Sequence, residues 1–521
     1  MSLASPRSRS RAGIANHELA KRSNFQLMSS RRVWWTNRAA LWLIAALFFL
    51  HLPLVSGQTL QRRSVAARPV RTKSGVGAVG ASGPSAGWQA CTECHQSTYS
   101  TAVRTEHAHA FDSIAAQGGQ DNSACNRCHT TQGFVNLSVT PQLVGVQCES
   151  CHGAAANHAA NPGDPIVTPV VTASASVCGT CHTGAQQPTF DEWQTSAHAT
   201  VTEANLNSSA CGRCHLGAAR LAMLTKQSAL QADHSTAVTC PVCHDPHATH
   251  VYKNPLNGTI NFTNILTGAV VVIDNSDLGA SYTAQLRNPL ASTKDYSLSP
   301  TDAFPGKYDA GINVCAQCHN RRGAAWSDTS SAPHKSPQYN VLLGTVGELP
   351  TGAKPGFPAT HSRLEKQCAG CHMPDVAHAG PPNLPPLASH TFTVRSYDLC
   401  AQCHRDAENA ANLVTNVQQL ITSEIAVIQS GLDEWATSKA PPALRAKYGT
   451  RAWEYTTPGE LSPGGPGPTK AEQALIPDNI KKARFNLYIV LQDGSYGVHN
   501  GPLATTLLDA AYEWVQAELN P

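Results

Sequence analysis

Eighteen cysteines dominate the chemistry that this sequence can perform. All of them fall in nine copies of Cys-x-x-Cys-His, and no cysteine lies outside a copy. Two thiols three residues apart point the same way on one helical turn, so they can form two thioether bonds to one edge of a porphyrin. The histidine that follows is then carried beneath the ring, where its imidazole can ligate the iron. The pattern therefore predicts nine covalently bound haem c groups.

The nine motifs supply two sets of predicted haem-binding residues. The predicted covalent attachment sites are Cys91, Cys94, Cys125, Cys128, Cys148, Cys151, Cys178, Cys181, Cys211, Cys214, Cys240, Cys243, Cys315, Cys318, Cys368, Cys371, Cys400 and Cys403. The predicted proximal iron ligands are His95, His129, His152, His182, His215, His244, His319, His372 and His404. We number the motifs one to nine in chain order.

Zinc and disulfide chemistry explain this spacing less well. A zinc site needs four ligands and no obligatory histidine after the second cysteine. A disulfide framework needs an even number of cysteines but no fixed spacing. Nine identical spacings with no cysteine left over therefore favour haem attachment.

Each haem iron also needs a ligand on the face opposite its motif histidine, or an open position for a substrate. Of the 23 histidines, nine are in motifs and His17 and His51 are in the N-terminal segment, which leaves twelve for nine irons. Of the four methionines, only Met223 is placed to act as a thioether ligand. Ligation by two histidines at every iron is therefore the prediction. The predicted distal ligands are His107, His158, His198, His234, His247, His334, His361, His390 and His499, and the surplus histidines are His109, His250 and His378.

The segments that precede the first motif read as an export signal and a linker. A basic region is followed by an apolar run, Ala39 to Leu50, and by small residues that suit cleavage before Gln58. Residues 1–57 are therefore predicted to be a signal peptide and residues 58–87 a flexible linker. An uncleaved membrane anchor is the alternative, although the run is short for a membrane span.

The charge balance changes when the predicted signal is set aside. The whole chain has 38 basic and 35 acidic side chains, and residues 1–57 hold eight and one of these, which leaves a net charge of −4. Such a chain gives no indication of nucleic-acid binding. Aromatic residues make up only 6 % of the chain, so protein side chains alone would form a thin core. We expect the porphyrins to supply much of it.

The remainder of the chain divides into four predicted regions. Residues 88–250 hold six motifs, 251–313 hold none, 314–404 hold three, and 405–521 read as a helical tail. The motif-free insertion contains β-branched text from Thr259 to Asn275, which predicts a β-hairpin or an irregular arm. Helical spacing of apolar residues predicts tail helices over Asp406–Trp435, Ile480–Leu491 and Leu503–Leu519. The predicted fold is therefore mainly α and loop-rich, with a core built from haem, a C-terminal helical hairpin or bundle and a small β-like insertion.

Several phrases around the motifs resemble those of a known superfamily. They are Trp193-Gln194-Thr195-Ser196-Ala197-His198, CESCHG with His158 after it, CPVCHDPH, Pro333-His334-Lys335-Ser336-Pro337-Gln338, CAGCHMP followed by His390-Thr391-Phe392, and Asp493-Gly494-Ser495-Tyr496-Gly497-Val498-His499-Asn500. In these phrases the chain resembles the multihaem cytochrome c superfamily, which includes tetrahaem electron carriers of ammonia oxidisers, pentahaem nitrite reductases and octahaem hydroxylamine-oxidising and tetrathionate-reducing proteins. The resemblance implies closely spaced haems and supports axial roles for His158, His198, His247, His390 and His499.

The superfamily contains both carriers and enzymes, so the resemblance leaves the activity open. An iron ligated by two imidazoles has no vacancy for a substrate, which favours a periplasmic or extracellular electron carrier of anaerobic or extracellular respiration. Its expected partners are other cytochromes and a quinol-oxidising membrane complex. One alternative is an oxidoreductase acting on nitrite, hydroxylamine or tetrathionate at one open haem, although no motif ends in the lysine of similar nitrite reductases. The other is a subunit of a homo-oligomeric conducting filament.

Overall fold

The computed structural model describes the chain from residue 84 onward, with gaps. The described residues are 84–131, 141–169, 171–200, 209–226, 237–247, 259–263, 270–274, 285–287, 314–351, 359, 361, 367–376, 387–462 and 464–521. They all belong to one compact unit. The predicted signal peptide, most of the predicted linker, and His234, His250 and His378 lie outside them.

Short helices and loops make up the haem-binding regions, as predicted. The α-helices there are α2 (Trp88–Thr92), α3 (Gln96–Ala102), α4 (Ala110–Ala115), α5 (Ser123–His129), α6 (Cys148–His152), α7 (Ala156–Ala160), α8 (Thr189–Thr195), α9 (Ser209–His215), α10 (Gly217–Thr225), α11 (Cys240–Cys243), α13 (Gln338–Leu343), α14 (Gln367–His372) and α15 (Ala401–His404). Single 3-10 turns cover Pro141–Leu143, Cys178–Thr180 and Ala197–Ala199.

The motifs form single helical turns because one backbone hydrogen bond spans each of them. In five motifs the amide of the histidine donates to the carbonyl of the first cysteine, which is the bond that closes a turn of α-helix. The N···O distances are 2.9 Å for His95 to Cys91, 3.0 Å for His182 to Cys178, 2.9 Å for His244 to Cys240, 2.8 Å for His319 to Cys315 and 2.8 Å for His404 to Cys400. This turn puts the two thiols and the imidazole on one side of the backbone.

Two small antiparallel strand pairs complete the described structure. β1 (Thr259–Thr263) pairs with β2 (Val270–Asp274), with Thr259 opposite Asp274. The predicted two-stranded insertion is therefore confirmed. β3 (Asp375–Val376) pairs with β4 (Leu387–Ala388), which the sequence did not predict because two residues are too short for a recognisable pattern.

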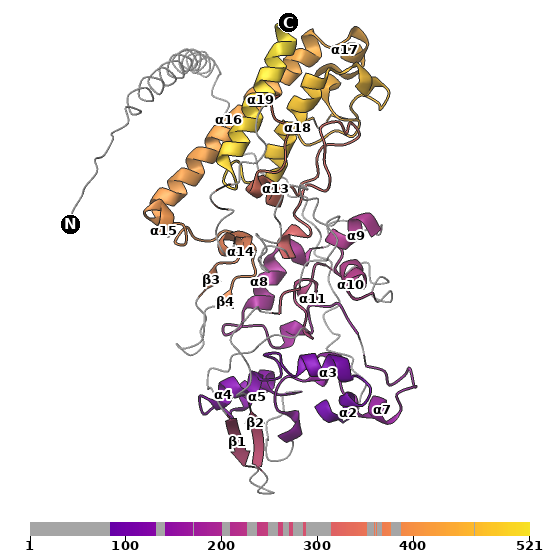
Figure 1. Ribbon diagram of the computed structural model, residues 1–521, viewed down its shortest axis with the longest axis vertical. Coiled ribbons are helices and arrows are strands. Elements are labelled where there is room, and N and C mark those ends of the chain that lie inside the picture. The colour runs from indigo at the N-terminus through magenta and orange to yellow at the C-terminus, as the bar shows by residue number, and fades with distance from the viewer. Residues whose placement is uncertain are drawn as a thin grey trace, which may run out of the picture. The chain divides into compact units, whose positions relative to one another are not determined.

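The C-terminal region is a bundle of three long helices, as predicted. α16 (Ala407–Ser438), α18 (Asp478–Asp493) and α19 (Gly501–Leu519) lie side by side, shown in orange and yellow in Figure 1. The shorter α17 (Pro442–Tyr448) and 3-10 turns at Gly449–Trp453 and Glu472–Leu475 cover one end.

The bundle has a conventional apolar core. On α16 the buried side chains recur every three or four residues, at Ile421, Ile425, Ile428, Leu432 and Trp435. Leu413 and Leu420, which are also apolar residues of this helix, are 51 % and 43 % exposed. The helix begins where the Asp406 side chain accepts a hydrogen bond from the Asn409 amide at 2.7 Å. No helix in the described part of the chain is long and apolar enough to cross a membrane.

Candidate haem sites

Eight of the nine motif histidines face one of the predicted distal histidines. The distances between ring centres are 6.5 Å for His95 and His158, 6.0 Å for His152 and His247, 6.0 Å for His182 and His107, 5.8 Å for His215 and His334, 6.2 Å for His244 and His390, 6.2 Å for His319 and His198, 6.1 Å for His372 and His499, and 6.1 Å for His404 and His361. Metal–nitrogen bonds of about 2 Å on both sides of an iron put the ring centres about 6 Å apart. The eight pairs therefore fit the two axial positions of one haem iron each.

The remaining motif histidine, His129 of the second motif, has a different setting. Its Nδ1 lies 2.5 Å from the Ala110 carbonyl oxygen and 3.3 Å from the Ser113 hydroxyl, which fixes the orientation of the ring. The eight pairs use every predicted distal ligand except His234, which lies outside the described residues.

The pairing crosses between distant parts of the chain. His158 follows the third motif and faces the first, and His247 follows the sixth motif and faces the third. His390 precedes the ninth motif and faces the sixth. Histidines that face each other in this way bring short helices from distant parts of the chain together.

Six of the sixteen facing histidines have a hydrogen-bond partner at Nδ1 that orients the ring. A hydrogen bond at Nδ1 fixes the imidazole and leaves Nε2 for a metal. The Nδ1 partners are the Phe392 carbonyl for His372 at 3.2 Å, the Ala388 carbonyl for His390 at 2.8 Å, the Ser336 hydroxyl for His334 at 3.1 Å, the Val498 carbonyl for His361 at 3.1 Å, the Gln338 amide oxygen for His319 at 3.4 Å and Asp493 for His499 at 2.8 Å.

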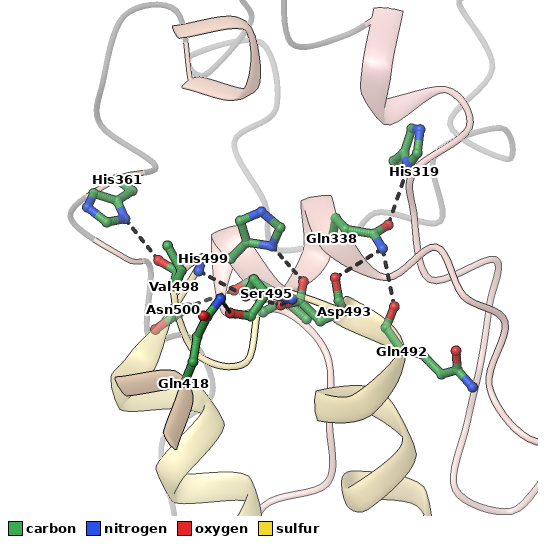
Figure 2. A network of polar contacts seen from close by, with 11 residues as sticks. His319, Gln338, His361, Gln418, Gln492, Asp493, Ser495, Val498, His499 and Asn500 are labelled. Carbon is green, nitrogen blue, oxygen red and sulfur yellow. Dashed lines mark hydrogen bonds and ion pairs between the residues drawn. The ribbon is translucent and has the colours of Figure 1, made fainter. Parts of the chain in front are cut away.

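One loop, residues 494–500 between α18 and α19, orients several of these ligands at once (Figure 2). His499 belongs to it and binds the Asp493 carboxylate, while the Val498 carbonyl binds His361. Gln338 bridges from His319 to the carbonyls of Gln492 and Asp493, each at 3.2 Å. The loop thus joins the sites of the seventh, eighth and ninth motifs to the helical bundle.

The loop keeps its position because it packs tightly on α16. Gly497 has φ +92°, and a Cβ there would lie 3.0 Å from Ile421 and 3.1 Å from Val417. A glycine is needed both for the backbone angle and for the close approach. The sequence predicted a helix on each side of this loop, but it did not predict the contacts of Asp493 and Gln338 with the facing histidines. An acidic residue six positions before His499 was the available signal.

The surplus histidine that the structure describes has a structural role. His109 Nδ1 lies 3.2 Å from the Asp112 carboxylate, and its Nε2 lies 3.1 Å from the Val103 carbonyl. Both ring nitrogens therefore have protein partners. That His109 is not an iron ligand stays a prediction.

The comparisons with known proteins agree with this geometry. A family model described as cytochrome c554 and c-prime matches residues 90–153. The structure is similar to that of the outer cell wall cytochrome OcwA, with a TM-score of 0.52 and 20 % identity over 83 % of this chain and 100 % of that one. The chain has the fold of a multihaem cytochrome c.

A second solved structure supports the same conclusion. It is an undecaheme cytochrome from the S-layer of Carboxydothermus ferrireducens, with a TM-score of 0.50 and 18 % identity over 83 % of this chain and 69 % of that one. No curated protein sequence matches the chain.

Three of the facing histidines are held in the neutral form that a metal requires. Burial is the main cause that lowers the pKa of His107, His198 and His334, in each case to about 4. For His499, burial lowers the pKa, but the Asp493 charge and hydrogen bond outweigh it and raise the pKa overall.

Thiols of different motifs also lie close to one another. In five pairs the two side chains interact directly, which helps to raise the pKa of one thiol in each, namely Cys148, Cys128, Cys178, Cys318 and Cys315. The pairs are Cys91 with Cys148, Cys128 with Cys181, Cys178 with Cys240, Cys214 with Cys318, and Cys315 with Cys368. Three more pairs are close enough for one charge to raise the pKa of the other thiol: Cys151 with Cys181, Cys243 with Cys315, and Cys371 with Cys400. These contacts show which motifs are neighbours in space.

Proposed function

We propose that this chain is an exported c-type cytochrome that binds nine haems and transfers electrons along them in anaerobic or extracellular respiration. The eight facing histidine pairs carry the proposal, because two imidazoles at one iron leave no position for a substrate. Haem supplies reversible one-electron chemistry when bound. The protein would attach it, hold the two imidazoles and set its surroundings.

The proposed axial ligands follow the observed pairs. The motif histidine of each pair is the proximal ligand and its facing histidine is the distal one. His129 and His234 are the remaining members of the two sets, so we assign His234 to the second motif. The other eight motif histidines already face a histidine of their own chain. In a filament whose subunits exchange axial ligands, the exchanged ligand would therefore serve the second motif.

The thiol contacts support a specific order of electron transfer. Six of the eight contacts join the first, third, fourth, sixth, seventh, eighth and ninth motifs into one line. The second motif attaches to the fourth, and the fifth attaches to the seventh. Porphyrins attached at neighbouring thiols have their edges close together, so we propose a line of seven haems with two single-haem branches.

The proposed location is outside the cytoplasmic membrane. The N-terminal segment has the pattern of an export signal, and the two similar structures are described as cytochromes of an outer cell wall and of an S-layer. Other redox proteins, including a quinol-oxidising membrane complex as the source of electrons, are the proposed partners.

Intact mass and spin-state measurements test this function. The full-length gene is expressed with a cytochrome c maturation system, and the mature protein is weighed. Nine added haems with purely low-spin ferric spectra are the expected result. Fewer than nine haems would refute the nonahaem proposal. A high-spin ferric signal that shifts on adding nitrite or hydroxylamine would replace the carrier proposal with chemistry at one iron.

A further inference from the structure

Arg220 is a buried cation in the middle of the haem-binding region. The residue is 2 % exposed and lies on α10, the helix that directly follows the fifth motif. α10 packs against α9, which carries the fifth motif, and against α11, which carries the sixth. Its neighbours Ala218 and Leu221 join an apolar cluster with Val242 of the sixth motif. Arg220 is therefore held between two motifs.

One nitrogen of the Arg220 guanidinium, Nη2, lacks a hydrogen-bond partner within the described structure. This atom is buried, and none of the described residues accepts a hydrogen bond from it. Arg484 is also buried and has no partner at Nε, but its Nη1 and Nη2 donate to the carbonyls of Trp453 and Glu454 and to the Gln473 side chain, at 2.7, 2.8 and 2.9 Å. A buried charge is costly unless something compensates it. The compensating group for Arg220 is therefore something other than the described side chains.

Arg220 is surrounded by haem attachment sites. Its charge reaches the thiols of Cys214, Cys243 and Cys318, the second cysteines of the fifth, sixth and seventh motifs. The sulfur of Cys214 also lies 4.0 Å from the Gln317 carbonyl oxygen, which brings the fifth and seventh motifs together. Arg220 thus lies where three haem attachment sites meet, at one of the two branch points.

We propose that Arg220 raises the reduction potential of the haems attached at the fifth, sixth and seventh motifs and so makes this junction the place where electrons collect. The proposal rests on the proposed function above. Reduction adds one electron from the preceding carrier to a ferric iron and gives ferrous iron, so the total positive charge falls by one. A fixed positive charge nearby favours the reduced state, and burial protects this effect from screening by water and salt. A haem propionate paired with the guanidinium would not change this sign.

The test compares three variants of the matured full-length protein. Arg220→Gln removes the charge, and Arg220→Lys keeps it. Arg405→Gln is the matched control, because Arg405 directly follows the ninth motif but its side chain is 85 % exposed. Intact mass first gives the haem count of each protein. The protein is then reduced stepwise with dithionite, and the haem absorbance is recorded at each measured potential. The absorbance plotted against the potential is the titration curve.

For Arg220→Gln, the expected result is that part of the redox titration curve moves to lower potential. About a tenfold loss of electron affinity at the nearest haems, equal to about 59 mV for a one-electron couple, is expected from one charge at this range. Arg220→Lys keeps the charge and should show little of this shift, and Arg405→Gln should leave the curve close to that of the unsubstituted protein.

Other outcomes separate the two proposals. If the unsubstituted protein has fewer than nine haems, the proposed function fails, whereas the shift at Arg220 can still be measured. If all proteins retain their haems and Arg220→Gln leaves the curve unchanged, the role of Arg220 is refuted. If Arg220→Gln loses haem and Arg220→Lys does not, the charge is required at the cofactor, which supports the proposal. Loss of haem from both variants would show a packing role and would overturn it.

Discussion

Neutralising Asp493 should raise the reduction potential of the haem at the eighth motif. Asp493 is 5 % exposed, and its carboxylate accepts a hydrogen bond from His499 Nδ1 at 2.8 Å. A carboxylate behind an axial imidazole adds negative charge near the iron and makes the imidazole a stronger donor, and both effects favour the ferric state. In Asp493→Asn the amide oxygen can still accept the hydrogen bond, so the charge changes while the geometry is kept.

The magnitude follows from the distance between the carboxylate and the iron position. The hydrogen bond of 2.8 Å and the width of the ligated ring together put the carboxylate roughly 7 Å from the metal. One unit charge at about 7 Å contributes about 2 kcal/mol at an effective dielectric constant of about 20. Since a tenfold change in a one-electron equilibrium is about 59 mV, the expected rise is about 100 mV.

A redox titration of the matured protein measures this shift. Asp478→Asn is the matched control, because Asp478 begins the same helix, α18, and its side chain is 66 % exposed. The titration should show one haem displaced to higher potential in Asp493→Asn and none in Asp478→Asn. A curve for Asp493→Asn that is unchanged or displaced to lower potential, with the haem count preserved, would refute the orientation of His499 by this carboxylate.

Two further substitutions test the ligand pairs and the packing between motifs. His158→Ala removes the imidazole that faces His95 and should produce a high-spin ferric signal from one haem, whereas His109→Ala should not; equal spectra would contradict the pairing. Gly217→Ala places a Cβ 2.0 Å from the Ala237 carbonyl oxygen, so it should cost about 1–3 kcal/mol in thermal unfolding and reduce haem attachment at the sixth motif. Gly163→Ala, which adds a Cβ in open space, should do neither, and equal melting temperatures for the two variants would show that α10 can move away.

The tail helices and the strand pair in the insertion could be predicted because their signals are local. Apolar residues at helical spacing predicted α16, α18 and α19, and a run of β-branched residues predicted β1 and β2. The exposed Leu413 and Leu420 show the limit of this reasoning. Periodicity identifies a helix, but the width of its buried face depends on which neighbours pack against it.

The sequence by itself determined the attachment chemistry, because two thioether bonds and one iron ligand need only five residues in a single helical turn. It also identified a group of spare histidines large enough to supply the second ligands. Only the tertiary structure decided which histidine faces which motif, since a ligand across the porphyrin plane comes from wherever the chain folds back. His499 faces His372 because the α18–α19 loop packs on α16, and Arg220 meets three motifs because α10 packs on two helices. Neither contact leaves a mark in the spacing of residues along the chain.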